Sequence, residues 1–309
     1  MSFDRLIARI VETGNPTVVG LDPKLDYIPE HIKEAAFQEH GNTLRGAAEA
    51  FLTFNKGIID AVCDIVPAVK PQCAYYEMLG YEGMRALYET IQYAKSRGMF
   101  VITDGKRNDI GSTMEAYAVA HLGEISINGA VAEPFGGDAL TVNGYLGTDG
   151  IKPLLGICNA KDKGIFALVK TSNPSSGELQ DREIDGEAVY SIMAGMCEAW
   201  GAESMGQYGY SAVGAVVGAT YPAQLAELRK KAPHTFFLVP GYGAQGGTAA
   251  DVAGAFDEKG LGAIVNSSRA ILTAWKKQNA PGEEYAAAAR NEAIRMRDDI
   301  TQYIPKITL

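Results

Sequence analysis

Met99-Phe-Val-Ile-Thr-Asp104-Gly-Lys106-Arg-Asn-Asp109 is a short apolar run that ends in closely spaced acids and bases. An unbroken apolar run of this length is typical of a strand that is covered on both faces, as in a parallel sheet. The charged residues begin where the run stops. The segment therefore predicts a buried strand that carries functional side chains at its carboxyl end.

Seven similar apolar runs occur elsewhere, and longer segments with helical character separate them. Strands that alternate with helices indicate βα units and a parallel sheet. Eight units predict an α/β protein with a closed TIM (β/α)8 barrel, and a doubly wound open sheet is the alternative. The predicted strands are Pro16–Leu21, Ile65–Lys70, Met99–Asp104, Ala139–Asn143, Ile165–Lys170, Ala212–Val217, Thr235–Val239 and Ala263–Asn266, and the predicted helices include Gly46–Cys63, Tyr76–Arg97, Gly186–Trp200, Pro222–Lys231 and Ala286–Tyr303.

The length of 309 residues suits one large domain, because α/β barrels often exceed about 250 residues as a single unit. We therefore expect one catalytic barrel domain over 1–309. Two stretches between the predicted elements, near 26–43 and 123–138, are interpreted as insertions or long loops.

Composition narrows the class of partner and the compartment. The net charge of −9 argues against nucleic acid or an anionic membrane as the main partner, since both attract basic surfaces. The sequence contains no uninterrupted run of 18 apolar residues, so it predicts no membrane span. The amino-terminal residues are polar and amphipathic, and the four cysteines form no C-x-x-C pair, so we expect a cytoplasmic protein with reduced thiols. The four histidines have no metal-ligand spacing, and we predict no metal site.

Charged residues at two neighbouring strand ends should meet. Lys70 ends the second predicted strand, and adjacent strands lie about 5 Å apart. One alternating array of lysines and aspartates could therefore form from Lys70, Asp104, Lys106 and Asp109. Thr113 follows Asp109 by four residues, so the two would share a face if both were helical. Taken alone, the same segment could equally be a solvated turn between strand and helix.

The segment from Asp104 to Thr113 closely resembles the active-site signature of orotidine 5′-phosphate decarboxylases, in the wording of their bacterial second-type branch. The resemblance extends from Gly20-Leu-Asp-Pro23 to Asn266-Ser-Ser-Arg269. It implies a TIM barrel and a homodimer that shares its active sites. The implied reaction is cofactor-free decarboxylation of orotidine 5′-monophosphate to UMP in de novo pyrimidine biosynthesis.

The resemblance also assigns roles to the charged residues. Lys70 matches the first lysine of the family's charged network, Asp104 the carboxylate beside the scissile carboxyl group, and Lys106 the proton donor. In the family, the second aspartate and the residues after it reach into the partner subunit's site. In this chain these residues are Asp109, Ile110 and Thr113.

Further positions match the residues that bind substrate. Asp22 corresponds to the residue that holds the ribose hydroxyls, and Ser172 resembles the serine that contacts the pyrimidine. Gln245 and Arg269 resemble the pair that grips the phosphate, and Pro240 begins the glycine-rich loop that carries Gln245. On the residues alone, this loop could be a flexible turn and Arg269 a surface ion-pair residue.

The chemistry requires a group that stabilises charge on a ring carbon. Loss of CO2 from C6 leaves a carbanion in the ring plane, and many decarboxylases use a cofactor as electron sink. A protonated Lys106 beside C6 could stabilise that charge and deliver the proton. Two alternatives remain open: a Mg²⁺-dependent phosphosugar enzyme with the same D-x-K-x-x-D motif, and a non-catalytic protein that binds a phosphorylated ligand. The charge supplied by Lys70 argues against the first, and the intact charged set argues against the second.

Overall fold

Eight parallel strands close into a barrel in the order β1-β12-β11-β10-β7-β6-β3-β2. The computed structural model describes residues 2–243 and 245–309. All eight predicted strands are present, so the TIM barrel is confirmed and the open-sheet alternative is wrong. The barrel strands are β1 (Thr17–Leu21), β2 (Ala68–Pro71), β3 (Phe100–Arg107), β6 (Ala139–Val142), β7 (Gly164–Lys170), β10 (Val213–Val217), β11 (Phe237–Val239) and β12 (Ala263–Ser267).

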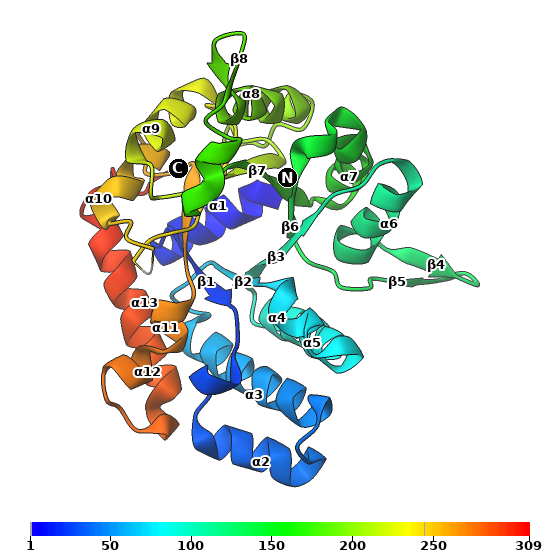
Figure 1. Cartoon of the computed structure of the whole chain (residues 1–309), viewed down its shortest axis with the longest axis vertical. Coiled ribbons are helices and arrows are strands. Elements are labelled where there is room, and N and C mark those ends of the chain that lie inside the picture. The colour runs from blue at the N-terminus through cyan, green and yellow to red at the C-terminus, as the bar shows by residue number, and fades with distance from the viewer. Residues whose placement is uncertain (1, 244) are drawn as a thin grey trace.

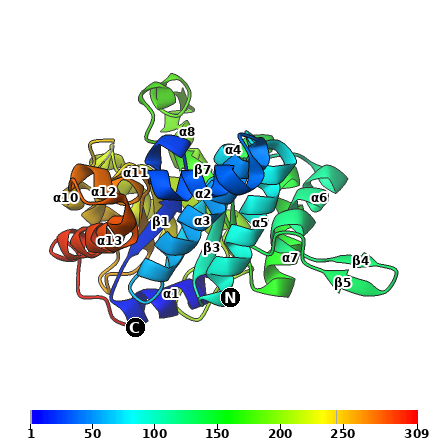
Figure 2. The same cartoon turned by 90° about the horizontal axis from the view of Figure 1, so that it is seen from below.

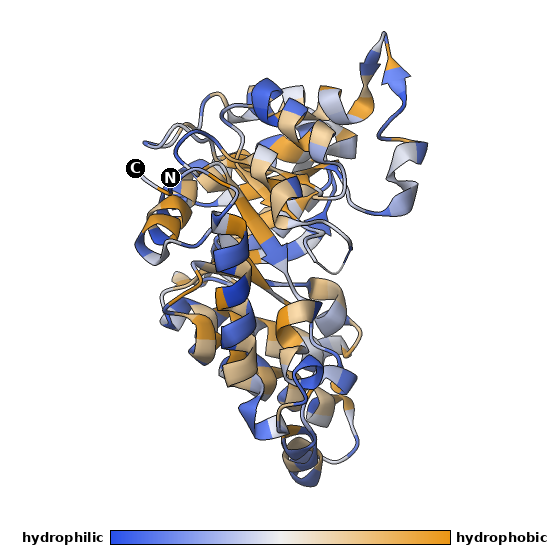
Figure 3. Cartoon of the chain, turned by 90° about the vertical axis from the view of Figure 1, so that its left-hand side faces the viewer, coloured by the Kyte–Doolittle hydropathy of each residue, from blue (hydrophilic) through white to orange (hydrophobic). Residues whose placement is uncertain are grey.

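Helices surround the barrel and cover the outer face of its strands (Figure 1). Figure 3 shows the central strands as mostly hydrophobic, whereas many helix segments on the outside are hydrophilic. The main outer helices are α3 (Leu44–Val62), α5 (Gly80–Ser96), α6 (Gly111–Leu122), α7 (Thr148–Lys161), α8 (Val189–Gly201), α9 (Pro222–Lys231) and α13 (Tyr285–Thr301). Shorter elements complete the set: η2 (Gly144–Leu146), η3 (Pro174–Glu178), α10 (Ala249–Val252), η4 (Ala253–Ala255), α11 (Arg269–Leu272), α12 (Ala274–Lys277) and η5 (Gly282–Glu284).

Two predicted helices differ from the structure. The expected helix 76–97 is interrupted after α4 (Cys73–Glu77), and α5 begins at Gly80, whose φ of 62° lies in the left-handed region. The expected helix Gly186–Trp200 begins only at Val189, because β8 (Glu183–Ile184) and β9 (Glu187–Ala188) form a hairpin before it. Its turn is Asp185-Gly186, both with positive φ, the dipeptide that suits a two-residue hairpin turn.

The two segments interpreted as insertions or long loops both contain regular structure. The first holds η1 (Leu25–Tyr27) and α2 (Glu30–His40), which packs on α3, so a long loop is wrong there. The second holds β4 (Ile125–Ile127) and β5 (Ala130–Ala132), an antiparallel hairpin that projects from the body beyond α6 and α7 (Figures 1 and 2).

The amino-terminal helix α1 (Ser2–Thr13) covers the end of the barrel where the strands begin (Figure 2). Its Phe3 ring lies 4.8 Å from the ring of Phe166 and 5.5 Å from that of Phe236. Three apolar side chains of α1 are at most 1% exposed: Phe3, Leu6 and Ile7. They form a tightly packed apolar layer across this end of the barrel, here called its floor. Polar side chains are left to gather at the opposite, carboxyl end. No helix in the described part of the chain is long and apolar enough to span a membrane.

Candidate active site

Asp104 lies at the centre of the carboxyl mouth, where four donors reach its carboxylate. Lys70 Nζ donates to Oδ2 over 2.6 Å and Lys106 Nζ donates to Oδ1 over 2.7 Å. Gln72 Nε2 donates to Oδ2 over 2.9 Å, and the Thr141 hydroxyl donates to Oδ1 over 2.8 Å. The three residues Lys70, Asp104 and Lys106 are called the charged triad below. The two lysines are thus held on opposite oxygens of one carboxylate.

Burial and charge act against each other within the charged triad. Lys70 is 4% and Asp104 6% exposed. Burial works to raise the pKa of Asp104, but the ammonium groups of Lys70 and Lys106 outweigh it and hold the pKa well below its usual range. Burial likewise works to lower the pKa of Lys70, but the carboxylates of Asp104 and Asp22 hold it above its usual value. The buried pair is therefore fully ionised near neutral pH.

Lys106 reaches back to Asp104 because its backbone leaves the strand conformation. Its φ is 47°, in the left-handed region that non-glycine residues rarely adopt. The Thr141 hydroxyl accepts the Lys106 backbone N–H over 2.9 Å, and this hydrogen bond holds the turn in place. The Lys106 side chain remains 46% exposed, so its ammonium group faces the mouth of the barrel.

Asp109 does not join the charged triad within one chain. Its Oδ1 accepts the backbone N–H of Ile110, and among the described residues no hydrogen bond or ion pair connects it to the triad. Within one chain the expected array of four therefore holds only three members, and the place of Asp109 in a partner's site stays a prediction. The shared helical face of Asp109 and Thr113 is also wrong, because α6 begins only at Gly111. Ile110 is 52% exposed and Thr113 is exposed, so both are accessible to another molecule.

Two cavities open beside the charged triad, and together they gather most of the other predicted site residues. The Ser172 cavity, of about 440 Å³, is lined by the whole triad together with Ser172, Pro240 and Gln245. The Arg269 cavity, of about 420 Å³, is lined by Asp22, Pro240, Gln245 and Arg269, and by Lys70 and Asp104. Because the two cavities share four lining residues, they lie side by side at the mouth. This volume suits a small molecule.

The Arg269 cavity has features that suit a phosphorylated sugar. Asp22 Oδ1 is buried without a hydrogen-bond partner, which leaves an acceptor for a ligand hydroxyl. Glycines 241, 243 and 246 all have positive φ, so the loop can bring its backbone close to a ligand. Of the glycine-rich segment predicted here, Ala244 lies outside the described residues. Tyr242 anchors the loop, since its hydroxyl donates to Asp299 of α13 over 2.5 Å.

Several lining residues were not predicted from the sequence. Gln72 and Thr141 hold Asp104, and Lys24, Tyr75 and Asn266 line the Arg269 cavity. Gln72 stands two residues after Lys70, a spacing that could have suggested a shared face. Thr141 lies inside an apolar run, where threonine is an ordinary strand residue.

The histidines and cysteines line neither of these two cavities. His121 is buried and stacks on Phe135, with ring centroids 5.2 Å apart. In the described part of the chain, no three His, Cys, Asp or Glu side chains gather in a way that could hold a metal ion. Of the four free cysteines, Cys63 is half-buried and the others are buried.

Comparison with known proteins gives consistent matches. Residues 47–283 match the model of the orotidine 5′-phosphate decarboxylase / HUMPS family. A Rhodopirellula baltica protein named orotidine 5′-phosphate decarboxylase is 46% identical over 300 residues, which cover 96% of this chain and 97% of the relative. A Clostridium tetani protein of the same name is 43% identical over 98% of this chain and 99% of its own length. The structure of Leishmania donovani OMP decarboxylase aligns with a TM-score of 0.74 and 29% identity over 98% of both chains.

Proposed function

Because the chain belongs to the orotidine 5′-phosphate decarboxylase / HUMPS family, we propose that it decarboxylates orotidine 5′-monophosphate to UMP and CO2 in de novo pyrimidine biosynthesis. The observation that carries this assignment is the charged triad, in which two ammonium groups lie within 2.7 Å of one buried carboxylate at the mouth of the barrel. The enzyme is thus a carboxy-lyase. We place the reaction in the cytoplasm, where its four free thiols stay reduced.

The two cavities suggest how the substrate lies. The phosphate would occupy the Arg269 cavity, between Arg269 and the loop that bears Pro240 and Gln245. The ribose hydroxyls would donate to the unsatisfied oxygen of Asp22. The pyrimidine would then extend into the Ser172 cavity, with C6 beside the Lys106 ammonium. Binding energy at the remote phosphate could then orient the ring for the reaction.

In the proposed mechanism, the bond between C6 and its carboxyl carbon breaks and the electron pair stays on C6. The Lys106 ammonium stabilises this charge electrostatically and transfers one proton to C6, which yields UMP. The amine regains its proton from solvent, to which the side chain is 46% exposed. Because the Lys106 ammonium supplies positive charge at the reacting carbon and Lys70 balances Asp104, we propose that the reaction requires neither cofactor nor metal.

Two roles for Asp104 were open from the sequence: repulsion of the substrate carboxylate or positioning of Lys106. The four donors around Asp104 support positioning, because they already compensate its charge in the free site. Lys70 would balance the charge of Asp104 when Lys106 gives up its proton. An unpaired buried carboxylate would otherwise cost several kcal/mol.

We also propose a homodimer in which Asp109, Ile110 and Thr113 complete the partner's site. Ile110 and Thr113 are exposed, and the half-buried Asp109 is separate from the triad, so all three are available to a second copy. Asp109 would then contribute the negative charge that is absent from the single-chain array.

The test is to mix the purified protein with orotidine 5′-monophosphate and follow the loss of its ultraviolet absorbance. We expect rapid decay with wild type, unchanged by excess EDTA, and loss of most activity in Lys106→Ala. Inhibition by EDTA that Mg²⁺ reverses would instead favour a metal-dependent phosphosugar enzyme. Tight UMP binding without turnover would favour a non-catalytic binding protein.

A further inference from the structure

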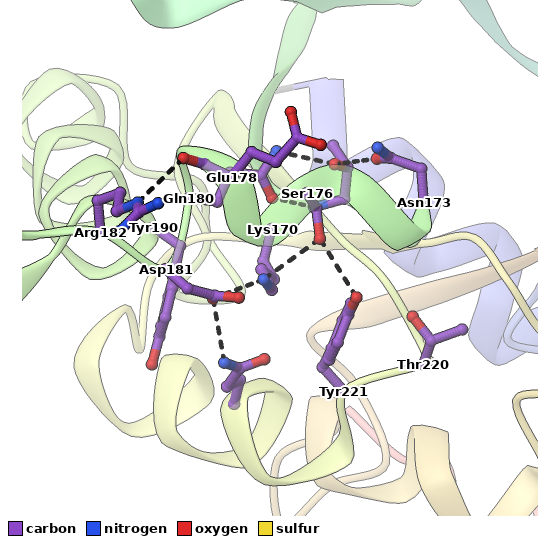
Figure 4. Close-up of polar contacts among 12 residues, drawn as sticks. Lys170, Asn173, Ser176, Glu178, Gln180, Asp181, Arg182, Tyr190, Thr220 and Tyr221 are labelled. Atoms are coloured by element: carbon purple, nitrogen blue, oxygen red, sulfur yellow. Dashed lines mark hydrogen bonds and ion pairs between the residues drawn. The ribbon is translucent and has the colours of Figure 1, made fainter.

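Lys170 ends strand β7 with its side chain fully buried, beneath the loop that carries Ser172. No step of the proposed reaction uses it. Figure 4 shows its ammonium group under η3, between Asp181 and Tyr221. A buried ammonium without partners would cost several kcal/mol, so its partners show what holds it.

Those partners come from the segment immediately after it. Lys170 Nζ donates to Asp181 Oδ1 over 2.6 Å and to the Ser176 hydroxyl oxygen over 3.3 Å. Beneath it, the ring of Tyr221 provides a cation–π contact, with Nζ 4.3 Å from the ring centroid. Gln224 Nε2 also donates to Asp181 Oδ1, over 3.3 Å. The ammonium group thus ties both the middle and the end of residues 171–181, here called the 171–181 loop, to the barrel.

The opposite side of the 171–181 loop forms a wall of the reaction site. The Ser172 cavity is lined by the charged triad and by four residues of this loop: Thr171, Ser172, Asn173 and Gln180. Gln180 Oε1 accepts the Thr171 backbone N–H over 2.9 Å, and its Nε2 donates to the Thr171 hydroxyl oxygen over 2.8 Å. The two ends of the loop are therefore joined at the cavity wall.

The 171–181 loop has little apolar material with which to pack. Leu179 is its one large apolar side chain, and it is 54% exposed. Ser176, one of the two oxygen partners of Lys170, is its one buried residue. Loops without buried apolar contacts open at low free energy. The Lys170–Asp181 ion pair is therefore one anchor of this cavity wall, beside backbone contacts such as the Tyr190 N–H donated to the Gln180 carbonyl oxygen.

We propose that Lys170 is a positioning residue for recognition of the nucleobase: its ion pair with Asp181 fixes the 171–181 loop so that Ser172 and Gln180 face the pyrimidine. The inference rests on the proposed function for the identity of the ligand. The position of the loop can be tested without turnover.

The kinetic test compares Lys170→Met, Asp181→Asn and the double variant. We expect the KM for orotidine 5′-monophosphate and the inhibition constant of UMP to rise roughly 10- to 100-fold, the scale on which misordered contacts weaken a ligand. The inhibition constant of ribose 5-phosphate should change less than about twofold, because this probe lacks the base and occupies the Arg269 cavity. The double variant should resemble the single variants, since both remove the same ion pair.

Lys161→Met is the matched control, because it removes a partly exposed ion pair with Glu124 at the end of α7, and neither residue lines the two cavities, so it should alter no constant. If Lys170→Met does not fold, Asp181→Asn decides alone, since the Asp181 side chain is 40% exposed. Equal weakening of UMP and ribose 5-phosphate, or a lowered Tm with unchanged constants, would overturn the proposal.

Limited trypsin digestion gives a readout that does not depend on the reaction. Arg182 directly follows the loop and is exposed. Cleavage after Arg182 should be faster in Lys170→Met and Asp181→Asn than in wild type or Lys161→Met. Cleavage at the wild-type rate would overturn the anchoring role. Faster cleavage in a protein whose wild type does not decarboxylate orotidine 5′-monophosphate would instead retain the anchor and refute the proposed function.

Discussion

At the scale of single residues, the site depends on the Thr141 hydroxyl. This group accepts the Lys106 backbone N–H and donates to Asp104, so it fixes both the turn and the carboxylate. It is 1% exposed, and water cannot easily replace it. Lys106, the proposed proton donor, and the Asp104 carboxylate that holds it are therefore aligned by one oxygen atom.

We predict that Thr141→Val lowers kcat by roughly 10- to 30-fold with a smaller change in KM, because loss of one buried hydrogen-bonding group costs about 1–3 kcal/mol. Thr141→Ser keeps the hydroxyl and should retain most of the activity. Steady-state kinetics on both variants provide the measurement. Equal activity of the valine and serine variants would contradict the role given to the hydroxyl.

The residues that the sequence revealed differ in kind from those it concealed. Lys70 and Asp104 were predictable because a charge that ends an apolar run is unusual, and the family motif identified Lys106. Thr141 was not predictable, because its role depends on β6 lying next to β3 in the closed barrel. The position of Asp109 away from the triad depends on where α6 begins, and helix boundaries are the least certain part of a sequence prediction.

At the scale of elements, the eight strands were predictable because each is a short apolar run covered on both faces. The helices were less predictable where local turns compete with periodicity. Gly80 interrupts the helix expected over 76–97, and Asp185-Gly186 forms a hairpin turn where a helix start was expected. Both signals are single glycines whose backbone conformation becomes clear only in the structure.

Helix α6 contains a buried titratable group whose effect on stability can be measured. His121 is 3% exposed and stacks on Phe135 at the base of the β4–β5 hairpin. Burial, aided by the positive charge of Arg107, lowers the pKa of His121 to about 4 from its usual value of 6.5. The unfolded chain therefore binds a proton between these pH values that the folded chain does not.

We predict that this histidine contributes stability fully above pH 6.5 and that the contribution falls as the pH decreases toward about 4. The change in the free energy of unfolding should reach on the order of 3 kcal/mol. Urea unfolding at pH 7, 6 and 5 provides the measurement. His121→Phe should flatten the profile in this range. An unchanged slope in His121→Phe would contradict the assignment.

At the scale of the whole molecule, the exposed side chains near the mouth favour a second copy as partner. Tyr145 is 74% and Leu146 44% exposed, and both lie in η2. Leu146 and the backbone of Asp109 both lie beside Gly150, so this apolar surface is close to the residue that we propose completes the partner's site. A dimer over this surface would bury the apolar groups and could bring Asp109 to its partner's site.

We predict that mixing inactive Lys106→Ala with inactive Asp109→Ala restores activity. After random exchange of subunits, half of the dimers are mixed, and each has one intact site of two. Recovery should therefore approach about a quarter of wild-type activity. Mixing Asp109→Ala with a Lys106→Ala/Asp109→Ala double variant is the control and should restore none. Absence of recovery at any ratio, after proven exchange, would exclude a shared site.

The packing of α1 at one end of the barrel has a consequence for how carbon dioxide leaves the enzyme. Because Phe3 and its neighbours pack into the end of the barrel where its strands begin, we expect carbon dioxide to leave from the opposite, carboxyl end. Carbon dioxide would then pass Lys106 and leave through the same mouth of the barrel that admits the nucleotide. If that mouth closed, the release of carbon dioxide and the exchange of the nucleotide would both be slowed.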